Sequence, residues 1–198
     1  MTNPPTSSLP ERRIALVFAV VAGICWAGVL VLLAGVPAAA TQRWAAEGVF
    51  AMLLTFVAAV CTFVPIQRRF DLPGLVVQGV FGTTLLTLVL GVVPFPRGWL
   101  LSLPDTPVYV MLAIALFWAV SAVALPIVYV IGLRVFQSRA RRYDQRRARR
   151  HAYECGAAAV ALLLMAGLRV LTPLTAVLVV LIIIVVESLF LWFVETEA

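Results

Sequence analysis

Long apolar segments follow one another along nearly the whole chain and are separated by short polar stretches. Hydrophobic residues make up 63% of the 198 residues and charged residues 12%, whereas soluble domains average roughly 45–50% and 25%. A soluble chain of this length could not bury so much apolar surface. Because a helical span needs about 20 apolar residues, the sequence predicts an all-α polytopic transmembrane helix bundle.

The apolar runs predict about six spans. The first four cover residues 14–36, 44–66, 75–95 and 107–136, and Pro126 is expected to kink the fourth. A single helix over residues 155–194 would be about 60 Å long, twice the bilayer core. The end of the chain is therefore predicted to form a two-span hairpin that turns near residues 169–173. Its first span, about 151–170, is short, and a re-entrant segment is the alternative.

These runs divide the chain into five parts. We expect a disordered cytosolic tail over residues 1–13, a four-span bundle over 14–136, an arginine-rich cytosolic segment over 137–150, the hairpin over 151–194 and a C-terminal tail over 195–198. Residues 36–40 resemble a signal-peptidase site, but the preceding apolar run is longer than the roughly 7–15 residues of a signal peptide. The first span is predicted to be retained, and cleavage would leave five spans.

The basic residues are concentrated in one place. All fifteen are arginine, and eight of them lie between residues 134 and 150. With six spans and the N-terminus inside, the cytosolic side would hold twelve arginines and the other side three. This asymmetry follows the positive-inside rule. We therefore expect a bacterial-type cytoplasmic (inner) membrane protein with both termini cytosolic.

The arginine-rich segment repeats the motif Arg-Ala-Arg-Arg at residues 139–142 and 147–150. Without glycine or proline between residues 134 and 152, the fourth span could continue into it as a helix. The segment could dock anionic lipid head groups or an acidic partner, although a topology signal with a solvated charged face is the favoured interpretation. Charge this localised argues against nucleic-acid binding. The candidate docking residues are Arg139, Arg141, Arg142, Arg146, Arg147, Arg149 and Arg150.

Few polar side chains fall inside the predicted spans. Glu187 lies about seven residues before the inner end of the last span, and an ionisable group at that depth is costly and a functional candidate. Because no second acid follows at helical spacing, a structural role is favoured. Gln78 is a second polar candidate within the membrane. Glu47 is expected to pair with Arg43 four residues earlier.

Small residues recur every four positions on the first span, at Ala15, Ala19, Gly23 and Ala27. This spacing lets helix backbones approach closely in lipid. It predicts a packing stripe, and contact within the bundle is favoured over contact with a partner subunit. Chance is the other explanation, since alanine is common in such segments.

Motifs for catalysis, cofactors or metals are lacking in the sequence. His151 is the only histidine, which excludes bis-histidine haem ligation by this chain alone and an intramembrane serine–histidine site. His151 and Cys155 supply only two of the ligands that zinc requires. Glycine-rich phosphate loops and acidic pairs are also lacking. We expect neither an enzyme nor a bound cofactor or metal.

The leading hypothesis from the sequence is an accessory or scaffolding subunit of a larger inner-membrane complex, with other membrane subunits as partners. A small transporter or channel is the alternative, with Glu187, Gln78 and the Pro126 kink forming a polar path. An enzyme acting on lipid has the least support.

Overall fold

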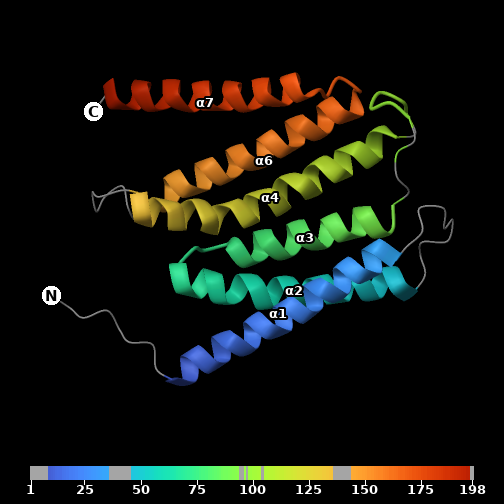
Figure 1. Ribbon diagram of the computed structural model, residues 1–198, viewed down its shortest axis with the longest axis vertical. Helices are drawn as coiled ribbons and strands as arrows, with labels where there is room; N and C mark the ends of the chain where they lie inside the picture. Colours follow the sequence, from blue (N-terminus) through green and yellow to red (C-terminus); the bar gives the residue numbers. More distant parts are fainter. Residues whose placement is uncertain are drawn as a thin grey trace. The chain divides into compact units, whose positions relative to one another are not determined.

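The computed structural model describes residues 9–35, 46–93, 96, 98–103, 105–135 and 144–196, with the backbone alone at 9–12, 35, 46, 187 and 190–196. All regular structure in these ranges is α-helical, as predicted. The helices are α1 (Leu9–Gly35), α2 (Ala46–Phe70), α3 (Leu75–Gly91), α4 (Thr106–Val135), α6 (Gln145–Gly167) and α7 (Pro173–Thr196). They belong to two compact units, Met1–Val93 and Pro94–Ala198 (Figure 1).

Three of the described helices are long and apolar enough to cross a membrane. They contain the segments Arg13–Ala34, Glu47–Phe70 and Thr106–Val135. The apolar segments Leu75–Gly91 in α3 and Pro173–Val186 in α7 are shorter, and α6 begins with four arginines in its first six residues. The helices are therefore compatible with insertion into a membrane.

In the first unit, α2 packs against both α1 and α3. A tight turn joins α2 to α3, and Asp71 and Gly74 in it adopt positive φ angles of 51° and 85°. Between them, the side chain of Leu72 is fully buried. The Gln67 side-chain oxygen accepts a hydrogen bond of 2.8 Å from the backbone N–H of Val76. This bond satisfies a donor that the first turn of α3 would otherwise leave without a partner.

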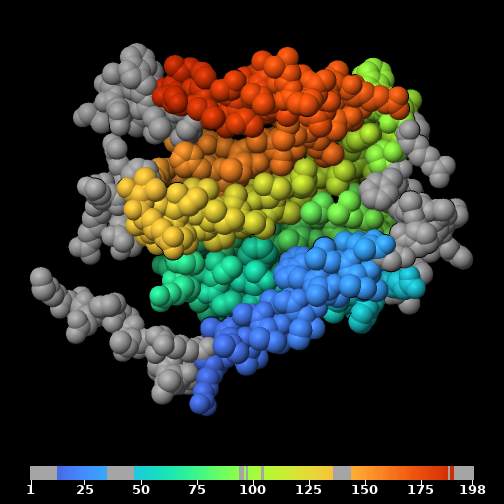
Figure 2. Space-filling model, viewed as in Figure 1, coloured from blue at the N-terminus to red at the C-terminus, as the bar shows by residue number. Residues whose placement is uncertain are grey.

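In the second unit, α6 packs along α4 and is followed by α7. The turn between α6 and α7 covers residues 168–172, near the position predicted from the sequence. Arg169 in this turn has a φ angle of 58° and is exposed. Val179 is the one buried residue among the side chains described for α7. In Figure 2 the coloured part of α7 (orange-red to red) lies open to view.

The helical path from α4 is interrupted before α6. Asp144 has extended backbone angles (φ −76°, ψ 97°), and its carboxylate accepts hydrogen bonds from the N–H groups of Arg146 and Arg147 at 3.0 and 3.2 Å. Aspartate is favoured at such N-caps because it satisfies the free N–H groups of the first turn. The expectation of an uninterrupted helix from the fourth span is therefore wrong at Asp144. Residues 136–143 lie outside the described ranges.

Candidate functional site

Small side chains bring α4 and α6 close together. On α6, Ala148, Ala152 and Gly156 recur every four residues, and all three are buried. A Cβ atom added at Gly156 would clash with Ser121 Oγ and lie 2.9 Å from the Phe117 carbonyl oxygen, both on α4. Small residues at this spacing are how helices pack when lipid provides no hydrophobic drive. Gly156 therefore sets the closest approach of the two backbones at this point.

The stripe on α6 was not predicted from the sequence, although the four-residue spacing of its small residues is the signal that could have revealed it. The predicted packing stripe consists of Ala15, Ala19, Gly23 and Ala27 on α1. All four residues are exposed in the structure. A Cβ atom added at Gly23 would have no neighbour within 4 Å.

Another face of α1 makes the contact with α2. A Cβ atom added at Gly28 would lie 2.7 Å from Leu54 Cδ2. Trp26 Nε1 donates a hydrogen bond of 3.1 Å to Thr62 Oγ1. The predicted stripe is thus left open by the packing of the first unit.

Four of the predicted docking residues lie in the first two turns of α6. Arg146 is exposed, whereas Arg147, Arg149 and Arg150 are partly buried. We call these four residues the α6 arginines. The other three candidates, Arg139, Arg141 and Arg142, lie outside the described residues.

Two acidic residues are in contact with this basic end of α6. Arg150 Nε lies 3.6 Å from Glu154 Oε1, and Glu154 Oε2 lies 3.0 Å from His151 Nδ1. The side chains of Arg150 and Glu154 are 33% and 30% exposed, so their ion pair adds little to stability. The second acid, Asp144, caps the helix. Four guanidinium groups and the two carboxylates of Asp144 and Glu154 thus lie together at the start of α6.

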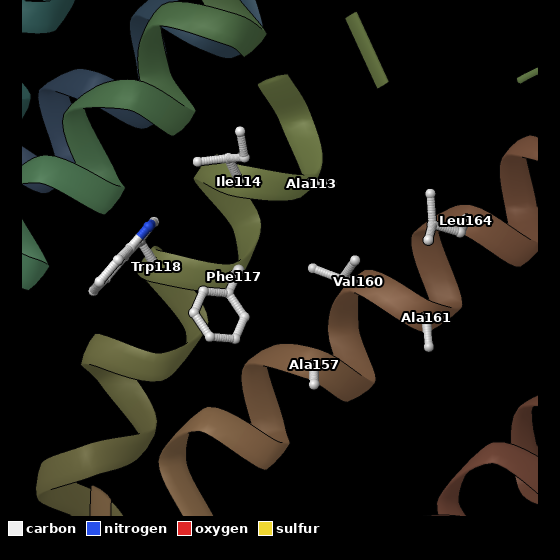
Figure 3. Close-up of a pocket in the computed structure, with 8 residues that line it drawn as sticks. All are labelled: Ala113, Ile114, Phe117, Trp118, Ala157, Val160, Ala161 and Leu164. Atoms are coloured by element: carbon white, nitrogen blue, oxygen red, sulfur yellow. The ribbon is translucent and has the colours of Figure 1, made fainter. Parts of the chain in front are cut away.

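An apolar groove of about 450 Å³ lies between α4 and α6 in the second unit (Figure 3). Phe117 and Val160 reach toward each other across it. Tyr153 stacks on Phe117 with 5.9 Å between the ring centroids and 23° between the planes. The lining residues are Ala113, Ile114, Phe117, Trp118, Ala157, Val160, Ala161 and Leu164. Alanine at three of these positions leaves the space that larger side chains would fill.

Buried threonines connect α2 and α3. Thr55 Oγ1 donates a hydrogen bond of 2.8 Å to the Ala51 carbonyl and lies 3.1 Å from Thr87 Oγ1. Thr83 and Thr87 each donate to the carbonyl four residues earlier, at 2.7 and 3.0 Å. Since bonds to these carbonyls satisfy the hydroxyl protons, the threonines fit a structural helix contact.

The three polar candidates of the sequence are not brought together within either unit. Gln78 is partly buried on α3 of the first unit, and its buried Nε2 has no hydrogen-bond partner among the described residues. Glu47 is exposed in the first turn of α2, and Arg43, its predicted partner, lies outside the described residues. Glu187 belongs to α7 of the second unit, and its side chain is also outside them.

Within the described residues, no group of three or more histidine, cysteine, aspartate or glutamate side chains could hold a metal ion. Cys25 and Cys61 are partly buried free thiols, and Cys155 is an exposed one.

Comparison of the chain with protein-family models, with curated proteins and with solved structures finds no match. Its function must be inferred from its own residues.

Proposed function

We propose that this chain is an integral inner-membrane protein without a catalytic site, which serves as an accessory or scaffolding subunit of a larger membrane complex. The supporting observation is the exposed stripe of small residues on α1. Such residues contribute little contact with lipid, but they allow a second helix to approach closely. Because α1 contacts α2 through another face, the stripe remains available for a helix of another subunit.

The arginines support a second docking surface on the cytosolic side. Arg134 lies in the last turn of α4, and the α6 arginines follow after the short connection 136–144. These five guanidinium groups therefore belong to one end of the α4–α6 pair, whereas Arg169 follows the opposite end of α6. In the proposed topology of about six spans, this basic end faces the cytosol and both termini lie on the same side. It would there contact an acidic surface of the partner.

The stripe can be tested by filling it. Gly23→Leu places a large side chain on the stripe at a position with no neighbour within 4 Å, so the fold of the first unit should be kept. Ala166→Leu is the matched control, since Ala166 is also exposed but lies on α6, away from the stripe. Membranes carrying each tagged variant would be extracted in mild detergent, and co-purified membrane proteins would be quantified by mass spectrometry.

We expect the wild-type chain and Ala166→Leu to retain the same partner subunits, and Gly23→Leu to lose most of them because the helices can no longer approach. A wild-type chain that purifies as a monomer without partners would contradict the scaffold role. Retention of the partners by Gly23→Leu would show that the stripe is not their docking surface.

A further inference from the structure

The apolar groove and two of the α6 arginines, Arg146 and Arg150, lie on the same face of α6. A helix turns 100° per residue at 3.6 residues per turn, so Arg146, Arg150, Ala157, Ala161 and Leu164 fall within a narrow sector of its circumference. Arg146 is exposed at the start of this sector, and Ala157, Ala161 and Leu164 line the groove (Figure 3). A ligand that follows this face would meet positive charge first and apolar surface next.

The spacing along the helix matches one leaflet of a bilayer. At a rise of about 1.5 Å per residue, Arg150 lies roughly 10 Å from Ala157 and roughly 20 Å from Leu164 along the helix axis. Half of the hydrocarbon core measures about 15 Å, with the head-group region beyond it. An acyl chain that extends from a head group at the arginines would therefore run along the groove.

Tyr153 marks the boundary between these two regions. It lies between Arg150 and Ala157 on the same face, is 40% exposed and stacks on Phe117 of α4. Tyrosine is enriched at membrane interfaces because its ring is apolar and its hydroxyl is polar. The groove volume of about 450 Å³ falls within the approximate range of 300–1,000 Å³ typical of small-molecule sites.

From this arrangement we infer that the α4–α6 groove binds one acyl chain of an anionic phospholipid, whose phosphate is held by Arg146 and Arg150. Guanidinium groups suit phosphate because they donate two parallel hydrogen bonds to it. Glu154 lies beside Arg150 and orients its side chain, and Asp144 is engaged with backbone N–H groups. The inference rests on the membrane insertion assumed in the proposed function, but it does not require a partner subunit.

The test is native mass spectrometry of the full chain in mild detergent, titrated with phosphatidylglycerol or with phosphatidylcholine of the same acyl chains. The charge variant is Arg146→Gln with Arg150→Gln. Its control is Arg68→Gln with Arg69→Gln, which removes the same charge from exposed positions at the end of α2. Ala161→Leu fills the groove without a change in charge, and Ala166→Leu adds the same bulk on the opposite, exposed face of α6.

We expect the wild-type chain to bind phosphatidylglycerol more tightly than phosphatidylcholine. The charge variant should weaken phosphatidylglycerol binding by roughly 25-fold, since each of the two arginines near the surface contributes a factor of about five, and its control should not. Ala161→Leu should weaken the binding of both lipids, whereas Ala166→Leu should leave it unchanged. Circular dichroism verifies that each variant retains its helices.

Equal binding of the two lipids by the wild-type chain would overturn the inference. So would an equal loss in the charge variant and its control, or lipid binding that Ala161→Leu leaves intact. A photo-crosslinker at position 160 that captures a partner polypeptide in the membrane, rather than lipid, would show that protein fills the groove. A chain that purifies without partners but binds phosphatidylglycerol as expected would refute the scaffold proposal alone.

Discussion

Gly156 illustrates how one residue can determine the distance between two helices. Its Cα faces Ser121 and the Phe117 carbonyl so closely that even a methyl group would clash. Gly23 on α1 is also a glycine in an apolar helix, yet a Cβ atom added to it would have no neighbour within 4 Å. Residue type and spacing alone therefore do not distinguish a packed glycine from an exposed one, because the difference depends on which helix lies opposite.

The first prediction concerns this pair of glycines. Gly156→Ala is expected to lower the stability of the chain by about 1–3 kcal/mol, the usual cost of overpacking a well-packed contact. Gly23→Ala should be neutral or stabilising by up to about 1 kcal/mol, since alanine is the better helix former. Thermal unfolding in detergent, followed by circular dichroism, measures both changes.

A second substitution tests the cause. Ser121→Gly removes the hydroxyl that the new methyl group would meet, so in the Gly156→Ala background it should recover part of the lost stability. Equal melting temperatures for Gly156→Ala and the wild-type chain would contradict the close contact.

At the scale of the helices, the length of the apolar runs in the sequence predicted the positions of most of them. Helices α1, α2, α3 and α4 correspond to the apolar runs over residues 14–36, 44–66, 75–95 and 107–136. Arg169 and Pro173 indicated the turn before α7. The span that corresponds to α6 was predicted to begin at about residue 151, whereas α6 begins at Gln145, and the residues before 152 were expected to continue the helix of the fourth span. The first turns of α6 contain four arginines, so they do not belong to an apolar run and were not predicted as part of this span. The signal that could have found it is Asp144, a typical N-cap residue.

The groove could not have been predicted from the sequence. It depends on Ala157 and Ala161 of α6 lying opposite Ala113 of α4, and the sequence does not determine the register of two helices joined by a loop. The sequence offers the basic residues only as a group of docking candidates, and the helical geometry separates Arg146 and Arg150 from their neighbours.

The second prediction concerns the beginning of α6. Asp144→Ala removes the side-chain acceptor for two backbone N–H groups and should cost about 1 kcal/mol. Asp144→Asn keeps an acceptor oxygen and should cost much less. Hydrogen exchange of the amides at residues 145–148 would report the fraying of this turn directly. If Asp144→Asn increased exchange as much as Asp144→Ala, the negative charge rather than the cap would be the stabilising feature.

At the scale of the whole molecule, the proposed topology makes the third prediction. Leu103 lies before α4 and should be outside the cytosol, whereas Asp144 lies after α4 and should be inside it. Alkaline phosphatase, which is active only outside, should be active when fused after residue 103 and inactive when fused after residue 144. A green fluorescent protein at the C-terminus should fluoresce, as it does in the cytosol. An active phosphatase after residue 144 would reverse the proposed orientation.

Among the described helices, each pair that packs together within one unit also follows one another in chain order: α1 with α2, α2 with α3, α4 with α6 and, less extensively, α6 with α7. Each such contact closes a short loop, which keeps the entropy cost of forming it small. During synthesis, each helix therefore finds its partner in the segment that was made just before it. The assembly of each unit can proceed stepwise as the chain leaves the ribosome, without waiting for a distant segment.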